Sequence, residues 1–479
     1  MTIIPLVEEM KLAGNLEEVF AVFKDDPHPF WLDSSRGGGS MGRWSFMGSH
    51  PFLVLRSFGD RVVVDEYGQQ REFKADPFTV LRTELSRFRI ERNDLPFPFL
   101  GGAVGFFSYD LGRMIETMPA SAHNDLTAPD IYLGFYGVFL VIDHVDNRAY
   151  LVGTGLPSTG EEGQRQARAD LARLRARLLA PRQMLADPWL ENNIAPDDIK
   201  TFFTRQTYGQ SILQIKEYIA AGDIYQANMT QRFDAPLAMP PYQLYRRLRQ
   251  VNPAPFAAYL DCGDGLAVLS SSPERFLRVA QNIVEARPIK GTRPRGKTPE
   301  EDRAQREELL ASEKDRAELM MIVDLERNDL GRVCAYGSVQ VPELFVLEEY
   351  ATVFHLVSTV RGELAQGRDI VDLLRATFPG GSITGAPKIR AMEIIEELEP
   401  VRRGIYTGSL GYIAFDGRAD LNIVIRTFVR QNNMVYLQVG GGIVADSDPM
   451  LEYEETLHKA KALLRSLGVH SFAAGSDES

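Results

Sequence analysis

The chain has 479 residues, 44% of them hydrophobic and 25% charged, so it is long enough for two or three domains with a large core. Its formal net charge of −12 at pH 7 argues against nucleic acid as a partner, because proteins that bind nucleic acid usually present a basic face. Its two cysteines, Cys262 and Cys334, provide neither a disulfide framework nor metal-ligand spacing. The N-terminal sequence and the interrupted apolar runs predict neither a targeting peptide nor a membrane span, so we expect a cytoplasmic protein.

The first part of the chain is predicted to form antiparallel strands. Residues 40–156 hold short alternating or apolar segments separated by Gly, Asp and Asn, which is typical of an antiparallel sheet. Residues 160–180 are charged and strongly helical, and residues 181–198, with Pro, Asn and Asp, predict a linker. We therefore place a first domain at residues 1–190.

The second part of the chain mixes helices with strands. Helices are expected at residues 207–221, 298–329 and 449–467. Strands are expected near residues 257–260, 266–270 and 276–279, and in the segments LGYIAF, LNIVIRTFVR and MVYLQVGGGIV. Because no regular βαβ alternation is present, the predicted fold class is α+β, with a second domain at residues 200–479.

Lys290 lies between a predicted strand, residues 282–287, and a turn rich in Gly and Pro, which is a suitable place for a nucleophile. A lysine amine attacks carbon only when it is neutral, so partial burial or a neighbouring cation would have to lower its pKa. Most lysines are solvated surface charges, and this alternative stays open from the residues alone.

The same turn matches the phosphate-loop pattern GxxxxGK[ST] over residues 291–298. Pro294 removes one backbone N–H from that loop, and the apolar run at residues 319–323 is predicted to be helical instead of a strand. Parallel βαβ units are also missing elsewhere. A P-loop nucleotide hydrolase is therefore kept only as a remote alternative.

Two predicted helices each carry a pair of carboxylates three residues apart. Asp315 and Glu318 precede the apolar run of a buried helix, and Glu452 and Glu455 are followed by Lys459 one turn later. Two such pairs could clamp one Mg²⁺, which commonly takes few protein carboxylates. From spacing alone, two solvated faces with i,i+4 pairing are the favoured alternative.

Four further features could belong to a site, although each is weak alone. Glu274 precedes a strand and could be a general acid, but a turn or salt-bridge role is more common. His355 lies on a short β-type run, where a lone histidine usually belongs to the core. Gly440–Gly442 offer backbone N–H groups to a carboxylate, and Arg426, inside a predicted strand, would need an anion.

In this order, the segments resemble those of the chorismate-utilising enzymes, which include the large subunits of anthranilate synthase and of aminodeoxychorismate synthase. The resemblance covers nearly the whole chain and implies a large antiparallel β-sandwich core with helices packed outside. Its densest stretches are GDIYQANMTQRF, SSPERF, PIKGTRPRG, AELMMIVDLERNDLGRV, HLVSTVRGEL, FPGGSITGAPKIRAMEII, IYTGSLGY and VGGGIVADSDPMLEYEETLHKAKAL.

Two positions distinguish members of this family. Anthranilate synthases usually carry Ala where this chain has Lys290, whereas PIKGT is typical of aminodeoxychorismate synthases. Isochorismate and salicylate synthases place a water-activating lysine where this chain has Gln226. The resemblance implies formation of 4-amino-4-deoxychorismate, toward 4-aminobenzoate and folate. Anthranilate synthase component I, in tryptophan biosynthesis, is the alternative, and an inactive tryptophan-sensing homologue is a third.

The resemblance also implies the reaction. Glu274 would protonate the departing C4 hydroxyl of chorismate while neutral Lys290 attacks ring carbon 2. Ammonia would then attack carbon 4 and expel the lysine. Neither cysteine lies in a nucleophile-elbow context, so ammonia is expected from a separate glutamine amidotransferase subunit.

Metal and substrate ligands are implied in the same way. Glu318 and Glu455 would bind Mg²⁺, with Asp315 and Glu452 in its outer shell. The residues implied in substrate binding are Gly291, Thr292, His355, Ser382, Tyr406, Arg426, Gly441, Gly442 and Lys459.

Other segments resemble a tryptophan pocket of the family. That pocket is the feedback site in anthranilate synthases and can be a retained structural ligand site in aminodeoxychorismate synthases, while simple packing is the alternative. The implied residues are Ser34, Met41, Gly42, Arg43, Trp44, Phe256, Ala257 and Ala258.

Overall fold

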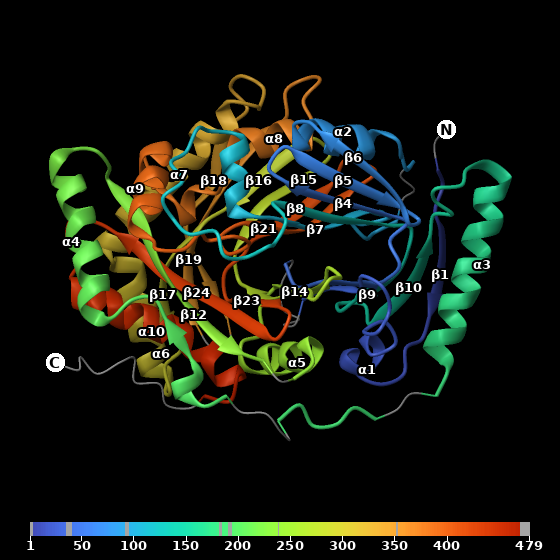
Figure 1. Cartoon of the computed structure of the whole chain (residues 1–479), viewed down its shortest axis with the longest axis horizontal. Coiled ribbons are helices and arrows are strands. Elements are labelled where there is room, and N and C mark those ends of the chain that lie inside the picture. Colours follow the sequence, from blue (N-terminus) through green and yellow to red (C-terminus); the bar gives the residue numbers. More distant parts are fainter. Residues whose placement is uncertain are drawn as a thin grey trace.

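In the computed structural model, the chain folds into two large antiparallel sheets that pack face to face, with helices around them (Figure 1). The structure describes residues 3–34, 41–91, 95–181, 184–189, 194–237, 239–350 and 353–469. Within these ranges each sheet has twelve strands, and neighbouring strands pair antiparallel, as residues 102–107 do with residues 131–136. The predicted α+β sandwich is therefore confirmed.

The first sheet has the following strands in spatial order: β1 (Leu6–Met10), β10 (Arg148–Gly153), β9 (Val138–Asp143), β3 (Trp44–Gly48), β2 (Phe30–Asp33), β13 (Phe256–Asp261), β14 (Leu266–Ser272), β23 (Thr427–Gln431), β24 (Met434–Ile443), β12 (Gln226–Pro236) and β11 (Lys200–Thr201), with β20 (Gly385–Ala386) paired to β12.

The second sheet follows the order β17 (Ile289–Pro294), β19 (Val353–Glu363), β16 (Ile283–Arg287), β15 (Arg275–Ala280), β22 (Ala419–Ile423), β21 (Ser409–Ala414), β7 (Gly102–Phe107), β8 (Ile131–Tyr136), β4 (Leu53–Phe58), β5 (Arg61–Glu66) and β6 (Gln69–Lys74), with β18 (Gln340–Glu349) paired to β19.

Helices cover the outer faces of both sheets. They are α1 (Leu16–Phe20), α2 (Pro77–Ser86), α3 (Gly160–Leu179), α4 (Arg205–Ala221), α5 (Pro241–Val251), α6 (Pro299–Ala311), α7 (Glu313–Gly331), α8 (Ile370–Thr377), α9 (Lys388–Leu398) and α10 (Pro449–Ser466), with the short 3-10 helices η1 (Tyr109–Met114), η2 (Pro196–Asp198) and η3 (Gly381–Ile383). Helices α5 and α10 pack on the first sheet, and α7 packs on β17 and β19 of the second (Figure 1). In the described part of the chain, no helix has the length and apolarity that crossing a bilayer requires.

Strand β2 shows how the first sheet is buried on both faces. Phe30 points into the core between the sheets, where Phe46 also meets Tyr412 of the second sheet. The next residue, Trp31, packs against Phe20 of α1 and Tyr245 of α5 on the outer face. Successive strand residues point to opposite faces, so a strand covered on both sides is apolar without alternation.

The two sequence regions that were predicted as domains share both sheets. In the first sheet β2 pairs with β13, and in the second β7 pairs with β21. The boundary between residues 190 and 200 stays a prediction, and the regions on either side of it form one sandwich. The predicted linker, residues 181–198, lies partly outside the described residues.

Two predicted elements differ from the structure. Residues 298–329 form two helices, because Ser312 separates α6 from α7 and its hydroxyl accepts a hydrogen bond from Asp315 N at 3.2 Å as an N-cap. The predicted strand LNIVIRTFVR is broken as well. Its first part is β22 in the second sheet, and its second part is β23 in the first sheet. Between them Arg426 has a φ of 54°, which no regular strand allows.

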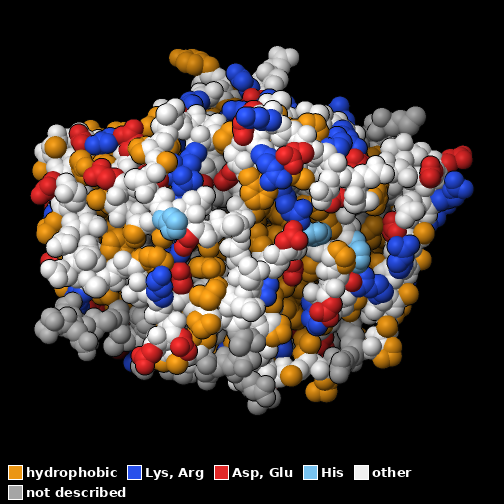
Figure 2. Space-filling model, viewed as in Figure 1, with side chains coloured by type: hydrophobic (Ala, Val, Ile, Leu, Met, Phe, Trp, Pro, Cys, Tyr) orange, Lys and Arg blue, Asp and Glu red, His pale blue; other side chains and the backbone are white. Residues whose placement is uncertain are grey.

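Charged side chains are spread over the surface in Figure 2. On the face shown, basic and acidic groups alternate around hydrophobic patches, so the negative net charge is not gathered into one field there.

Candidate active site

A cavity of about 730 Å³ is lined by residues of both sheets and by α7 and α10. Every residue that was predicted for catalysis, substrate binding or metal binding lines this cavity. The structure thus brings together side chains that lie up to 185 positions apart in the chain, from Glu274 to Lys459. Their individual roles stay predictions.

Two crossings between the sheets carry Glu274 and Arg426. The chain leaves the first sheet after β14 and enters the second at β15, and it returns from β22 to β23. Backbone hydrogen bonds join the two crossings: Ile423 N donates to Glu274 O at 3.0 Å, and Ser271 N donates to Arg426 O at 3.1 Å. Glu274 and Arg426 are therefore fixed beside each other at the junction of the sheets.

Glu274 is a buried carboxyl group with a raised pKa. Burial raises its pKa to about 7, although a hydrogen bond with Ser382 and the charge of Lys290 oppose the rise. Near neutral pH a large fraction of Glu274 is therefore a carboxylic acid, as a general acid must be.

Lys290 reaches the cavity through a β-bulge. Residues 289–294, which were predicted as a turn, form β17, and the register with β19 shifts between Lys290 and Thr292. Gly291 is the extra residue, with a φ of 78°, and a Cβ there would lie only 2.8 Å from Leu309 Cδ1. Bulges of this kind re-aim neighbouring side chains. Lys290 Nζ lies 3.9 Å from Glu318 Oε2 with 15% of its side chain exposed, so the solvated-lysine alternative is wrong.

The phosphate-loop alternative fails on the same residues. An extended strand occupies residues 289–294, where that motif requires a loop around phosphate. The apolar run at residues 319–323 lies within α7 and is not a strand.

His355 is held neutral by its surroundings. It lies on β19, and its Nδ1 is 2.9 Å from Thr292 Oγ1. Burial lowers its pKa to about 4, the charge of Glu348 opposes the drop and the charge of Arg426 adds to it. At physiological pH the imidazole is thus uncharged and can both donate and accept a hydrogen bond.

The two carboxylate pairs face one cavity instead of separate solvated surfaces. Burial raises the pKa of Glu318, and the charges of Asp315 and Glu455 add to the rise. Burial also acts on Glu455, but Lys459 Nζ, 2.6 Å from its Oε1, holds the pKa of Glu455 below its ordinary value. Burial raises the pKa of Glu452, whose Oε1 accepts a hydrogen bond from the Ser447 hydroxyl.

This donor set fits a hard divalent cation. All four carboxylates offer oxygen, and Mg²⁺ binds through one or two of them while keeping several waters. The described residues contain no group of three or more His, Cys, Asp or Glu side chains arranged to hold an ion. The metal site predicted at Glu318 and Glu455, with Asp315 and Glu452 around it, stays a prediction.

Arg426 is a partly buried cation with no ion-pair partner among the described residues. Burial lowers its pKa, and its Nη1 donates to the backbone oxygen of Lys459. Within the described residues it forms no salt bridge. Beside it, β24 continues through Gly440–Gly442, and a Cβ on Gly441 would lie 3.4 Å from Glu452 Oε2. A guanidinium removed from water without an ion-pair partner is stabilised by a bound anion, so this part of the cavity suits a carboxylate.

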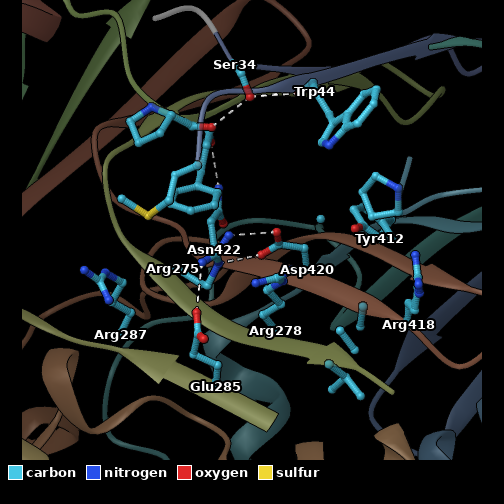
Figure 3. Close-up of a pocket in the computed structure, with 18 of the residues that line it drawn as sticks. Ser34, Trp44, Arg275, Arg278, Glu285, Arg287, Tyr412, Arg418, Asp420 and Asn422 are labelled. Atoms are coloured by element: carbon cyan, nitrogen blue, oxygen red, sulfur yellow. Dashed lines mark hydrogen bonds and ion pairs between the residues drawn. The ribbon is translucent and has the colours of Figure 1, made fainter. Parts of the chain in front are cut away.

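A second cavity of about 860 Å³ holds part of the predicted tryptophan site (Figure 3). Ser34, Met41, Trp44, Phe256 and Ala257 line it, whereas Gly42, Arg43 and Ala258 do not. Figure 3 also shows Arg275 between Asp420 and Glu285, with which it forms ion pairs.

Two of the three remaining residues of that prediction have other places. Arg43 pairs with Asp143 at 2.6 Å and lies over the Trp44 ring, and Ala258 belongs to the core between the sheets. Pro255 lines both cavities, so the two adjoin.

Several residues of the first cavity were not predicted. They are polar or charged side chains that also line it, among them Asn228, Thr230, Lys314, Tyr350, Gln438 and His458. A signal was present for Asn228 and Thr230. They lie two residues apart on one face of a strand that is buried except at its last residue, and buried polar side chains need hydrogen-bond partners.

Comparison with known proteins identifies the family of the chain. Residues 28–465 match the family described as chorismate binding enzyme. The chain is 42% identical over 452 residues to aminodeoxychorismate synthase component 1 of Bacillus subtilis, covering 92% of each chain. It is 38% identical over 478 residues to anthranilate synthase component 1 of Acetivibrio thermocellus, covering 97% of this chain and 95% of the other. The crystal structure of anthranilate synthase component I from Streptococcus pneumoniae superposes with a TM-score of 0.78 and 32% identity over 90% of this chain and 94% of that one. The chain therefore belongs to the chorismate binding enzyme family.

Proposed function

We propose that this chain is the component of an aminodeoxychorismate synthase that converts chorismate and ammonia to 4-amino-4-deoxychorismate, toward 4-aminobenzoate and folate. The observation that carries the proposal is Lys290, whose amine lies inside the cavity beside Glu318. Relatives named aminodeoxychorismate synthase component 1 that are 42% identical to the chain support it. Anthranilate synthase activity is the alternative, since relatives with that name are also similar.

Two sets of residues in the cavity suit the two carboxylates of chorismate. Arg426, Tyr406 and the backbone N–H groups of Gly441 and Gly442 would hold the enolpyruvyl carboxylate. The ring carboxylate would lie toward α7 and α10, where the proposed Mg²⁺ would balance its charge.

Magnesium is proposed for the end of the cavity near α7 and α10. Glu318 and Glu455 would hold Mg²⁺ directly, with Asp315 and Glu452 binding its waters. When bound, the ion would neutralise and orient the ring carboxylate.

The reaction would proceed by two displacements. Glu274 gives its proton to the C4 hydroxyl, which leaves as water while the neutral Lys290 amine forms a bond to ring carbon 2 and the ring double bonds shift. Ammonia then bonds to carbon 4, the bond from Lys290 to carbon 2 breaks, and the lysine leaves as the neutral amine. The product amine gives up the proton that restores Glu274.

Ammonia would come from a second protein. Relatives are named as a component 1, which supports a partner component, and we propose a glutamine amidotransferase subunit for it. The two cysteines of the chain, Cys262 and Cys334, are buried, and neither lines the cavity, so they are not suited to release ammonia from glutamine. Their unpaired state also supports the reducing cytoplasm as the location.

Product identity is the first test. The purified chain, supplied with chorismate, an ammonium salt and Mg²⁺, should form a product that added aminodeoxychorismate lyase converts to 4-aminobenzoate. The measurement is chromatography with and without the lyase. Direct formation of fluorescent anthranilate would instead identify the alternative activity.

Lys290→Ala tests the covalent step. Without ammonia, intact-protein mass spectrometry should show an adduct of chorismate less water on the unmodified chain and none on Lys290→Ala, because the nucleophile is removed. Lys297→Ala is the matched control, since Lys297 lies outside the cavity, and it should retain the adduct. If the adduct persists in Lys290→Ala, Lys290 is not the nucleophile.

Glu274→Gln tests the general acid and its pH dependence. Because the pKa of Glu274 is raised to about 7, the acid is present below that pH and is lost above it, so kcat should fall as pH rises through 7. Glu274→Gln should lower kcat by roughly 10²- to 10⁴-fold and remove this alkaline limb. Rates are compared at equal concentrations of free ammonia. If kcat of Glu274→Gln still falls as pH rises through 7, the fall belongs to the titration of another group.

A further inference from the structure

Helix α7 positions η3, the segment that carries the Ser382 hydroxyl beside Glu274. Ser382, in η3, hydrogen-bonds the Glu274 carboxyl. η3 packs directly on α7, and a Cβ on Gly381 would lie only 2.5 Å from Leu325 Cδ2. The place of Ser382 therefore depends on how closely η3 is held against this helix.

Glu326 is a polar residue of α7 that contacts this segment. Its side chain is 3% exposed, and its carboxyl group accepts a hydrogen bond from the Gly381 N–H. Its Oε2 has no hydrogen-bond partner among the described residues. A buried polar atom without a partner destabilises a fold. An apolar side chain of similar volume would fill the space without that penalty, so packing alone does not account for an acid here.

Glu326 is mainly uncharged at neutral pH. Burial raises its pKa to about 8, the nearby Asp329 adds to the rise and Lys388 opposes it. Lys388 is itself engaged, because it forms an ion pair with Asp329 and donates to the backbone oxygen of Thr377 at 2.8 Å. A neutral carboxylic acid at this place resembles the amide of glutamine in shape and in its acceptor oxygen.

We propose that Glu326 is a positioning residue for Glu274: it holds η3 on α7 through Gly381, so that the Ser382 hydroxyl stays against the Glu274 carboxyl. This rests on the role proposed above for Glu274. The same helix carries Asp315 in its first turn and Glu318 three residues later. One helix would thus set two of the four carboxylates of the predicted metal site and also the orientation of Glu274.

Substitutions at Glu326 separate positioning from packing. Glu326→Met keeps the volume but removes the acceptor for Gly381, so kcat should fall roughly tenfold, as for one lost hydrogen bond, while KM for chorismate stays within about twofold. Glu326→Gln keeps the acceptor and should restore kcat. The melting temperature of Glu326→Met should change little, because loss of the unpartnered oxygen stabilises the fold while loss of the acceptor for the Gly381 N–H destabilises it. If Glu326→Met does not fold, Glu326→Leu takes its place.

A double-mutant cycle with Ser382 completes the test. Ser382→Ala should lower kcat by a similar factor, and Glu326→Met should slow that variant no further, because both changes remove the same contact on Glu274. The matched control is Glu84→Gln, a buried carboxyl of α2 that pairs with Arg71 and Arg87 and lines neither cavity, and it should leave kcat unchanged.

Three results would overturn the positioning role. The first is that the losses of kcat in Glu326→Met and Ser382→Ala add up in the double variant. The second is that Glu326→Gln is as slow as Glu326→Met. The third is that Glu326→Met raises KM for chorismate without lowering kcat. Absence of 4-amino-4-deoxychorismate from the unmodified enzyme would contradict the proposed function instead, so the two failures are distinguishable.

Discussion

The two crossings between the sheets are the constraint on which the cavity depends. The chain crosses from the first sheet to the second between β14 and β15, and it returns between β22 and β23. Hydrogen bonds from Ile423 N to Glu274 O and from Ser271 N to Arg426 O hold the two crossings together. Neither crossing can shift without breaking pairing in both sheets. The carboxyl group of Glu274 and the guanidinium of Arg426 are thereby held at fixed places, as rigid elements position a site more accurately than loops do.

Charge balance inside the cavity explains why its groups keep different protonation states. Burial shifts the pKa of each group toward its uncharged form, and neighbouring charges and hydrogen bonds then determine whether the group is ionised. Glu274 becomes partly neutral, whereas Glu455 stays ionised beside Lys459. Arg426 forms no ion pair among the described residues, and the effect of burial on its pKa is opposed only by Tyr406 and by the more distant charge of Glu455. In the proposed function, a carboxylate of chorismate would supply the ion pair that Arg426 lacks.

Much of this site could be predicted from the sequence, but not by spacing alone. The order of motifs assigned Lys290 and Glu274 through resemblance, whereas the residues themselves left both open. The break at Arg426 was missed because its β-branched neighbours continue across the crossing, and only the backbone φ of 54° reveals it.

Which helix faces meet is a tertiary fact that sequence spacing does not contain, so the carboxylate pairs first suggested separate solvated surfaces. Glu326 was missed although a signal exists. It follows Leu319, Ile322 and Val323 at the i, i+3, i+4, i+7 spacing of one buried helix face. A carboxyl group on such a face is unfavourable unless it has a hydrogen-bond partner or a counter-charge.

The affinity of the cavity for chorismate, measured by titration calorimetry without ammonia, tests the central claim that Arg426 completes it by binding a carboxylate. Lys290→Ala serves as the background so that no covalent bond forms. Adding Arg426→Met should raise the dissociation constant by at least roughly tenfold, since hydrogen bonds to charged groups contribute about 1.5–3 kcal/mol. Arg390→Met, on the surface of α9, should leave it unchanged. Equal affinity with and without the Arg426 guanidinium would contradict the account.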